Sequence, residues 1–109
     1  VIKLVKEVTR NPHETKREFY ERLLHHGSEK AKILKCADVI SNLTDLHIDN
    51  ISSNKIKTNL DLYEEIILPM AWEVNKNMHY EIEDLIHSRR IYVKSYHKDW
   101  LTSLLKKNI

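Results

Sequence analysis

The sequence contains one glycine, two prolines and one cysteine in 109 residues. A single glycine excludes a glycine-rich phosphate loop and argues against a turn-rich β protein. The lone Cys36 cannot form an internal disulfide, so a disulfide-stabilised scaffold is excluded. The longest apolar runs fall well short of the ~20 residues of a membrane span. A chain of this length can bury one hydrophobic core, which predicts a folded domain.

Charge is nearly balanced, because 18 lysine and arginine residues face 16 aspartate and glutamate residues, for a formal net charge of +2. This composition provides no bulk electrostatic attraction to nucleic acid. No targeting signal or low-complexity segment is evident. We therefore expect a cytoplasmic protein that binds neither nucleic acid nor membrane.

Helical start and stop signals occur along most of the chain, whereas strand alternation is absent. Asn11-Pro12-His13-Glu14 predicts a helix start, because proline suits the first helical position and glutamate the third. Gly27 predicts the end of that helix, and Ser28 can cap a third helix that runs to about residue 47.

The second half of the chain continues this pattern. Polar residues 48–57 predict a loop, and residues 58–61 (TNLD) fit a capping box for a fourth helix. Pro69 is expected to kink or reset that helix. A break at residues 75–77 then separates it from two further helices over 78–90 and 93–107. The predicted fold class is an all-α array of five to six helices.

Residues 29–47 combine apolar residues around most of the helix with one polar stripe. The apolar positions, which predict a helix buried in the middle of a bundle, are Ala31, Ile33, Leu34, Cys36, Ala37, Val39, Ile40, Leu43 and Leu46. The polar stripe follows spacings of three, four and three and consists of Lys35, Asp38, Asn42 and Asp45. At 3.6 residues per turn, these spacings confine it to about 80° of the circumference.

A stripe of this kind needs partners if it is buried, because a buried unpaired carboxylate is very costly. It could pair with charges on neighbouring helices, bind a metal ion or line a polar cleft. The alternative is a solvated face, on which Lys35 and Asp38 form a weak i, i+3 ion pair. That alternative predicts that Asp38 and Asn42 are well exposed, and the spacing alone leaves both interpretations open.

The stripe also carries a family resemblance. Residues 35–38 (KCAD) and 42–46 (NLTDL) resemble the KLAD and NLRDL motif of HD-domain metal-dependent phosphohydrolases. More narrowly, they resemble the C-terminal half of the RelA/SpoT-family (p)ppGpp hydrolase domain. Further similar segments occur in the family's order, at residues 4–9 (LVKEVT), 27–32 (GSEKAK), 60–63 (LDLY), 69–71 (PMA) and 80–85 (YEIEDL). The resemblance covers roughly residues 1–90, which leaves 91–109 as an additional C-terminal helix.

The resemblance implies a role for each residue of the stripe. Asp38 would be the last of four ligands of a divalent metal such as Mn²⁺, which accepts carboxylate and imidazole ligands. Asn42 would contact the nucleotide, while Lys35 and Asp45 would support the metal ligands or line the cleft. In the family, the metal activates water to hydrolyse the 3′-pyrophosphate of guanosine polyphosphates.

The sequence departs from the family pattern in one important respect. It contains no His-Asp dipeptide, and the other metal ligands and a Glu-Asp pair would all precede Val1. We therefore expect the C-terminal half of a hydrolase domain, inactive alone, and a first residue other than methionine fits this. The alternative is a non-catalytic helical interaction or nucleotide-binding domain derived from the HD scaffold. Without the upstream helices, the chain is expected to cover its apolar surface as a homo-oligomer.

Two further features could have a functional role: a histidine–glutamate pair and the single cysteine. His79 and Glu83, spaced i and i+4, could provide two metal ligands, but we interpret them as a solvent-facing helical pair. Cys36 falls on the apolar side of its helix and is interpreted as a small core residue rather than a reactive thiol.

Overall fold

The computed structural model describes residues 2–45 and 53–107, with side chains described for residues 2–45 and 54–91. Over this part of the chain the backbone forms α-helices and one π-helical turn, without a β-strand. The elements are α1 (Ile2–Glu7), α2 (Lys16–His26), α3 (Glu29–Thr44), α4 (Ser53–Leu62), η2 (Tyr63–Ile67), α5 (Leu68–Val74) and α6 (Lys76–Lys107). The all-α prediction is confirmed.

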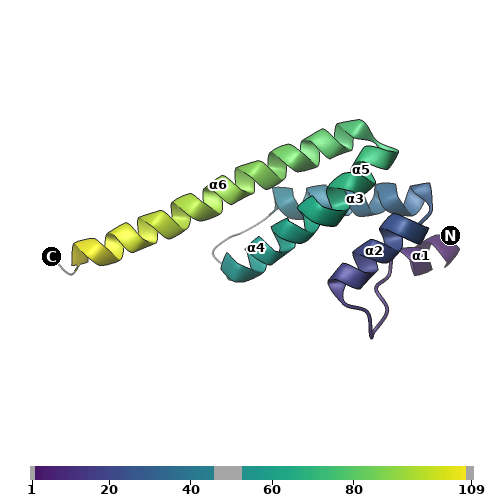
Figure 1. Cartoon of the computed structure of the whole chain (residues 1–109), viewed down its shortest axis with the longest axis horizontal. Helices are drawn as coiled ribbons and strands as arrows, with labels where there is room; N and C mark the ends of the chain where they lie inside the picture. The colour runs from purple at the N-terminus through teal and green to yellow at the C-terminus, as the bar shows by residue number, and fades with distance from the viewer. Residues whose placement is uncertain (1, 46–52, 108–109) are drawn as a thin grey trace.

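The long helix α6 organises the arrangement (Figure 1). It packs along α3 and α5 and also contacts α4, while α2 packs against α3 and η2. Its 32 residues span about 48 Å at 1.5 Å per residue. Figure 1 shows the C-terminal part of α6 extending past the other helices, which accounts for a longest dimension of 60 Å.

One hydrophobic core joins the helices. Many of its buried members recur at spacings of three or four, as expected for the inward faces of amphipathic helices. They are Phe19, Tyr20, Leu23, Ala31, Cys36, Val39, Leu43, Ile56, Leu60, Leu62, Tyr63, Ile66, Ile67, Met70, Ala71, Ile82 and Ile86. Each fully buried Leu or Ile side chain contributes about 1.5–3 kcal/mol. The interpretation of Cys36 as a core residue is confirmed.

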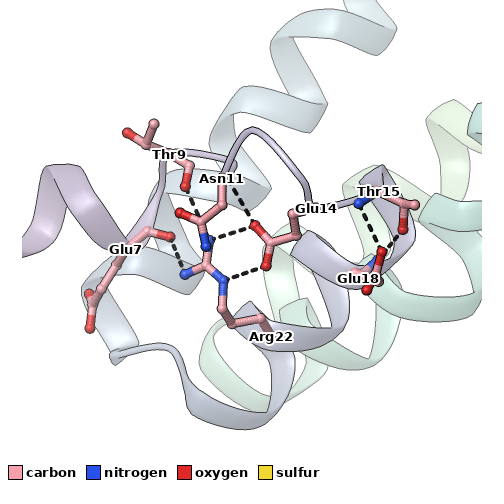
Figure 2. Close-up of polar contacts among 7 residues, drawn as sticks. All are labelled: Glu7, Thr9, Asn11, Glu14, Thr15, Glu18 and Arg22. Carbon is pink, nitrogen blue, oxygen red and sulfur yellow. Dashed lines mark hydrogen bonds and ion pairs between the residues drawn. The ribbon is translucent and has the colours of Figure 1, made fainter.

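Helix α2 starts at Thr15 rather than at the predicted cap, Asn11 (Figure 2). The Thr15 hydroxyl accepts a hydrogen bond from the Glu18 N–H at 3.1 Å, and the Glu18 carboxylate accepts one from the Thr15 N–H at 3.0 Å. Asn11 and Glu14 instead close a turn, because the Asn11 N–H donates to Glu14 Oε1 at 3.0 Å. The Asn11 prediction is wrong because this reciprocal Thr-x-x-Glu box satisfies the helix start.

The end of α2 and the start of α3 were correctly predicted. Gly27 follows the last helical residue, but its φ of −74° is ordinary, so a left-handed conformation is not the reason for glycine. A Cβ at this position would lie 2.5 Å from the Leu23 carbonyl oxygen, and the close approach of the backbone therefore requires glycine. The Ser28 hydroxyl accepts a hydrogen bond from the Ala31 N–H at 3.2 Å and caps α3. The predicted end of α3, at about residue 47, lies outside the described residues. Leu46, one of the predicted apolar positions of this helix, lies outside them as well.

Helix α4 begins at Ser53, within the predicted loop, and residues 48–52 of that loop lie outside the described residues. The predicted capping box at 58–61 is wrong, since these positions are inside the helix, where the Thr58 hydroxyl donates to the Asn54 carbonyl at 2.8 Å. Ile56 and Leu60, one turn apart, are both buried. Their packing stabilises a helix whose polar composition alone favours a loop.

The reset at Pro69 is confirmed. The π-helical turn η2 immediately precedes α5, in whose first turn Pro69 lies. Because proline has no N–H, it cannot continue the regular hydrogen-bond pattern, and a π turn changes the helical register there. The predicted break at 75–77 is confirmed at Asn75, which has extended backbone angles and ends α5.

Helix α6 is continuous, so the prediction of separate helices over 78–90 and 93–107 is wrong. The segment contains neither glycine nor proline, and no residue in it has to end a helix. The expected boundary between residues 90 and 91 therefore falls within one helix.

Two arginines of α6 bind neighbouring helices. Arg89 Nε donates to the Leu43 carbonyl at 2.8 Å and thereby caps the C-terminus of α3, where a cation is favourable. Arg90 pairs with Asp61 at 2.8 Å and with Glu64 at 2.6 Å. Among the described residues, no helix is both long enough and apolar enough to cross a membrane.

Candidate functional site

The polar stripe of α3 lies at the edge of the core. Only one face of α3 is buried, and it consists of Ala31, Lys32, Cys36, Val39 and Leu43. Leu34 is 48% exposed and Ala37 is exposed, so the prediction of a helix buried on nearly all sides is wrong. Within the described part of the chain, the other helices cover α3 from one side, which leaves its remaining surface open to solvent.

Lys35 joins the stripe to helix α2. Its side chain is only 13% exposed, and its ammonium lies 3.0 Å from Asp38 Oδ2. The same ammonium lies 5.1 Å from the centre of the Tyr20 ring and 5.3 Å from that of Phe19. A cation over aromatic faces is favourable, so these rings hold Lys35 against the core and direct its charge to Asp38. The predicted i, i+3 pair is present.

Asn42 is connected to a pair of buried tyrosines. The Tyr63 hydroxyl lies close to the Tyr20 hydroxyl and to the Asn42 side chain, and both of these polar groups act to lower the pKa of Tyr63. Burial raises the pKa of Tyr20 and of Tyr63 above the ordinary value of a phenol, and the negative charge of Asp38 raises both further. Both phenols are therefore protonated at neutral pH.

Lys16 adds a second cation from α2. Its ammonium donates to Asn59 Oδ1 of α4 at 3.0 Å. Partial burial lowers the pKa of Lys16, and the positive charges of Lys35, Lys55 and Arg10 lower it further, whereas Asp38 raises it. The pKa of Lys16 is thus influenced by positive charges from several segments and by the negative charge of Asp38.

The fourth residue of the predicted stripe, Asp45, terminates α3. It is the C-cap residue, and its N–H donates to the Ser41 carbonyl at 3.0 Å. It is exposed and lies two turns beyond Asp38 along the helix. The predicted stripe therefore divides into Lys35, Asp38 and Asn42, which interact with other helices or with one another, and Asp45 at the helix end.

Exposure favours the solvated-face alternative for part of the stripe. The Asp38 side chain is 54% exposed and Asn42 is exposed, as that alternative predicts. A plain solvated face does not predict the contacts that Lys35 and Asn42 make with Tyr20 and Tyr63. The arrangement is an open polar surface supported by buried aromatic groups, which is accessible to a ligand.

The donors around Asp38 show what the described residues themselves offer to a metal ion. Across residues 2–45 and the described side chains beyond, no group of three or more His, Cys, Asp or Glu side chains is arranged to hold a metal ion. The Asp38 carboxylate is instead paired with the Lys35 ammonium. These residues by themselves therefore do not fit a resident Mn²⁺ ion.

The His79 and Glu83 pair has the geometry of a helical surface contact. His79 Nε2 lies 3.4 Å from Glu83 Oε2, and His79 Nδ1 is hydrogen-bonded with the Leu68 carbonyl at 2.9 Å. The backbone contact occupies one ring nitrogen. Of the predicted solvent-facing pair, only Glu83 faces solvent, because the Glu83 side chain is 58% exposed and the His79 side chain only 16%.

Sequence reasoning missed Lys16, Tyr20, Asn59 and Tyr63 as members of this surface. They come from α2, α4 and η2, so no spacing along the chain relates them to α3. The four-residue spacing of Lys16 and Tyr20 does indicate a common helix face, but not which helix that face meets. Comparison with protein-family models and with curated proteins finds no match to this chain.

Proposed function

We propose that this chain forms the nucleotide-binding part of an HD-type phosphohydrolase acting on the 3′-pyrophosphate of guanosine polyphosphates or a related nucleotide. The observation that supports this proposal is the connection of Asn42 to Tyr63 and Tyr20 beside the Lys35–Asp38 pair. Amide, phenol and ammonium groups together supply the donors and acceptors that nucleotides require.

Each side chain has a distinct proposed role. Asn42 offers both a carbonyl oxygen and an NH₂ group, which suits contact with a base or ribose. Lys35 orients the carboxylate of Asp38 through their 3.0 Å contact. Asp38 would be one ligand of a divalent metal, which supplies Lewis-acid activation of water when bound. Further ligands have to come from outside the described residues, and we expect no hydrolysis by these residues alone.

Nucleotide binding is tested by titrating guanosine 3′,5′-bis(diphosphate) into the protein and measuring the heat of binding. Asn42→Ala is expected to weaken binding by at least ~10-fold, or ~1.4 kcal/mol. Asn77→Ala, which removes an exposed asparagine on α6, is the matched control and should bind like the wild type. No detectable binding, or equal affinity of the Asn42 and Asn77 variants, would contradict the proposal.

Hydrolysis is tested in the product of the complete gene, by measuring Mn²⁺-dependent release of pyrophosphate from the same nucleotide. Asp38→Ala should abolish release, while Asp84→Ala, at an exposed position on α6, should retain it. Unchanged release in the Asp38 variant would overturn the proposed role of this residue.

Two observations favour a second candidate function. Asp38 is paired with Lys35, and the described residues include no group of three or more side chains arranged to hold a metal ion. A carboxylate engaged by an ammonium suits a non-catalytic nucleotide-binding domain. This candidate predicts that nucleotide affinity is the same with and without Mn²⁺ and that the complete gene product releases no pyrophosphate.

A further inference from the structure

Two large aromatic side chains are exposed where α5 meets α6, at the corner between these helices (Figure 1). Trp72 of α5 is 47% exposed, and Tyr80 of α6 is 53% exposed. Tryptophan, tyrosine and arginine are the residues enriched at the energetic centres of protein interfaces. Neither aromatic residue belongs to the stripe of α3, so the proposed function does not account for their exposure.

A mostly buried histidine holds the two exposed rings in place. The centre of the His79 ring lies 5.1 Å from that of Trp72, at 73°, and 5.4 Å from that of Tyr80, at 82°. The Trp72 and Tyr80 rings are themselves nearly perpendicular, at 88°, with centres 6.1 Å apart. Such edge-to-face packing is favourable for aromatic rings. These three rings, the aromatic corner, are therefore ordered before a ligand arrives, which lowers the entropy cost of binding.

One ring of the aromatic corner already binds a cation. The Lys76 ammonium lies 4.8 Å from the centre of the Trp72 ring, within the range of a cation–π contact. In the part of the chain with described side chains, no cation lies over the Tyr80 ring. The corner thus attracts positive charge and has a second, exposed ring with which to do so.

Acidic side chains lie beside the exposed ring. Residues 76–84 (KNMHYEIED) contain three acidic residues, all of them exposed, and one lysine. Glu83 lies on the same side of α6 as Tyr80, because residues at i and i+3 of a helix are neighbours. The Glu83 side chain is 58% exposed, and one of its oxygens lies 3.4 Å from His79 Nε2. Its other oxygen can accept hydrogen bonds from a ligand, and the local charge favours a cationic one.

We propose that the aromatic corner and Glu83 bind an arginine side chain in a basic segment of a partner protein. A guanidinium group has a flat face that stacks on an aromatic ring and N–H groups that donate to a carboxylate. Tyr80 and Glu83, one helical turn apart, match these two features. A quaternary ammonium has no N–H donor and a lysine ammonium has no flat face, so each would use only part of this surface.

The first experiment measures binding of a fluorescently labelled arginine–glycine hexapeptide to the protein by fluorescence anisotropy at low ionic strength. A matched peptide with citrulline in place of each arginine keeps the flat group without its charge, and it should bind at least ~10-fold more weakly. A lysine peptide keeps the charge without the flat group and should bind at least ~3-fold more weakly than the arginine peptide. Equal affinity of the arginine peptide and either matched peptide would overturn the proposal.

Two variants test where the arginine peptide binds. Tyr80→Leu removes the aromatic face and Glu83→Gln removes the charge, and each should weaken binding at least ~5-fold. Glu29→Gln removes the same charge from an exposed position on α3 and should bind within about twofold of the wild type. Circular dichroism verifies that each variant is folded, and the nearly isosteric Glu83→Gln keeps the test valid if Tyr80→Leu is not. Wild-type affinity in either folded variant would overturn the proposal.

Lys76 allows a test in the opposite direction. Lys76→Met removes the cation from the Trp72 ring, so it should strengthen binding of the arginine peptide at least ~2-fold, because a like charge is lost and a ring face becomes free. Unchanged or weaker binding would contradict the proposal.

A second copy of the chain is the alternative occupant of the aromatic corner. Light scattering of the wild type and of Tyr80→Leu tests for it. A wild-type oligomer that dissociates in the variant would assign the surface to self-association and overturn the proposal. The same molar mass for both proteins, together with Tyr80-dependent binding of the arginine peptide, would support an external basic partner.

Discussion

Arg22 and Glu14 form a two-point ion pair in which Nε donates to Oε2 at 2.8 Å and Nη2 donates to Oε1 at 3.1 Å. The same guanidinium donates to the backbone carbonyls of Glu7 at 3.2 Å and Thr9 at 3.1 Å (Figure 2). One side chain of α2 therefore holds the end of α1 and the turn that follows it.

Replacing Arg22 by alanine should destabilise the protein by about 1–2 kcal/mol, because it removes charge-assisted hydrogen bonds from a partly buried group. The measurement is the midpoint of urea unfolding. Arg17→Ala is the control, since Arg17 pairs with Glu65 at 2.7 Å but both side chains are about half exposed. Its effect should be much smaller, because exposed ion pairs contribute little. Equal losses in the two variants would contradict the role assigned to Arg22.

Stability should fall in acid partly through Glu14. The hydrogen bond from Arg22 lowers the pKa of Glu14 below its ordinary value of 4.5, and the Asn11 N–H lowers it further. A carboxyl whose pKa is lower in the folded state stabilises the fold above the ordinary pKa, and this contribution is lost as the pH falls through the folded pKa.

Glu14→Gln should therefore be less stable than the wild type at pH 7, and its stability should decline less steeply below about pH 4.5. Urea unfolding of both proteins between pH 7 and pH 3 provides the measurement. Parallel stability curves over this range would show that Glu14 carries no such linkage.

Lys32 of α3 and Glu73 of α5 should respond unequally to substitution. The Lys32 side chain is 8% exposed, and its ammonium lies 2.9 Å from the more exposed Glu73 carboxylate. Glu73→Ala leaves the ammonium without its partner and should cost about 1–2 kcal/mol. Lys32→Met keeps an apolar side chain of similar length and should cost less than about 1 kcal/mol.

A double variant provides the control for this pair. Once Lys32 is methionine, Glu73→Ala should have little further effect, because the two residues are in direct contact and their effects are not additive. Additive losses in the double variant, or a milder effect of Glu73→Ala than of Lys32→Met, would contradict this prediction.

Cys36 should resist alkylation in the folded protein. It is fully buried, and burial raises the pKa of its thiol to about 11, although the positive charge of Lys35 acts in the opposite direction. The reactive species is the thiolate, which is scarce at pH 8 at such a pKa. Iodoacetamide at pH 8 should modify Cys36 at least ~100-fold more slowly in the native protein than in guanidinium chloride. Comparable rates, followed by mass spectrometry, would exclude a buried thiol.

Local sequence signals were sufficient where the decisive contacts span only a few residues. The Ser28 cap, the end of α2 before Gly27 and the reset at Pro69 depend on neighbouring backbone groups, and all were predictable. The start of α2 at Thr15 rather than Asn11 also depends on local contacts. Two competing start signals lie four residues apart, and only Thr15 forms a reciprocal capping box, with Glu18.

Other features depend on packing between distant segments. The segment from Ser53 is helical because Ile56 and Leu60 enter the core, which its polar composition does not reveal. Leu34 is exposed because the described helices cover α3 on one side only, and apolar periodicity cannot indicate how many neighbours a helix has.

The sequence by itself determined the all-α fold class and the stripe of Lys35, Asp38 and Asn42, because helical periodicity follows directly from residue order. Only the tertiary structure decided which groups meet that stripe. Lys16, Tyr20 and Tyr63 reach it from α2 and η2 through the packing of helices. Proximity in space, which sets burial and the interaction between charges, is a property of that packing and cannot be read from spacing along the chain.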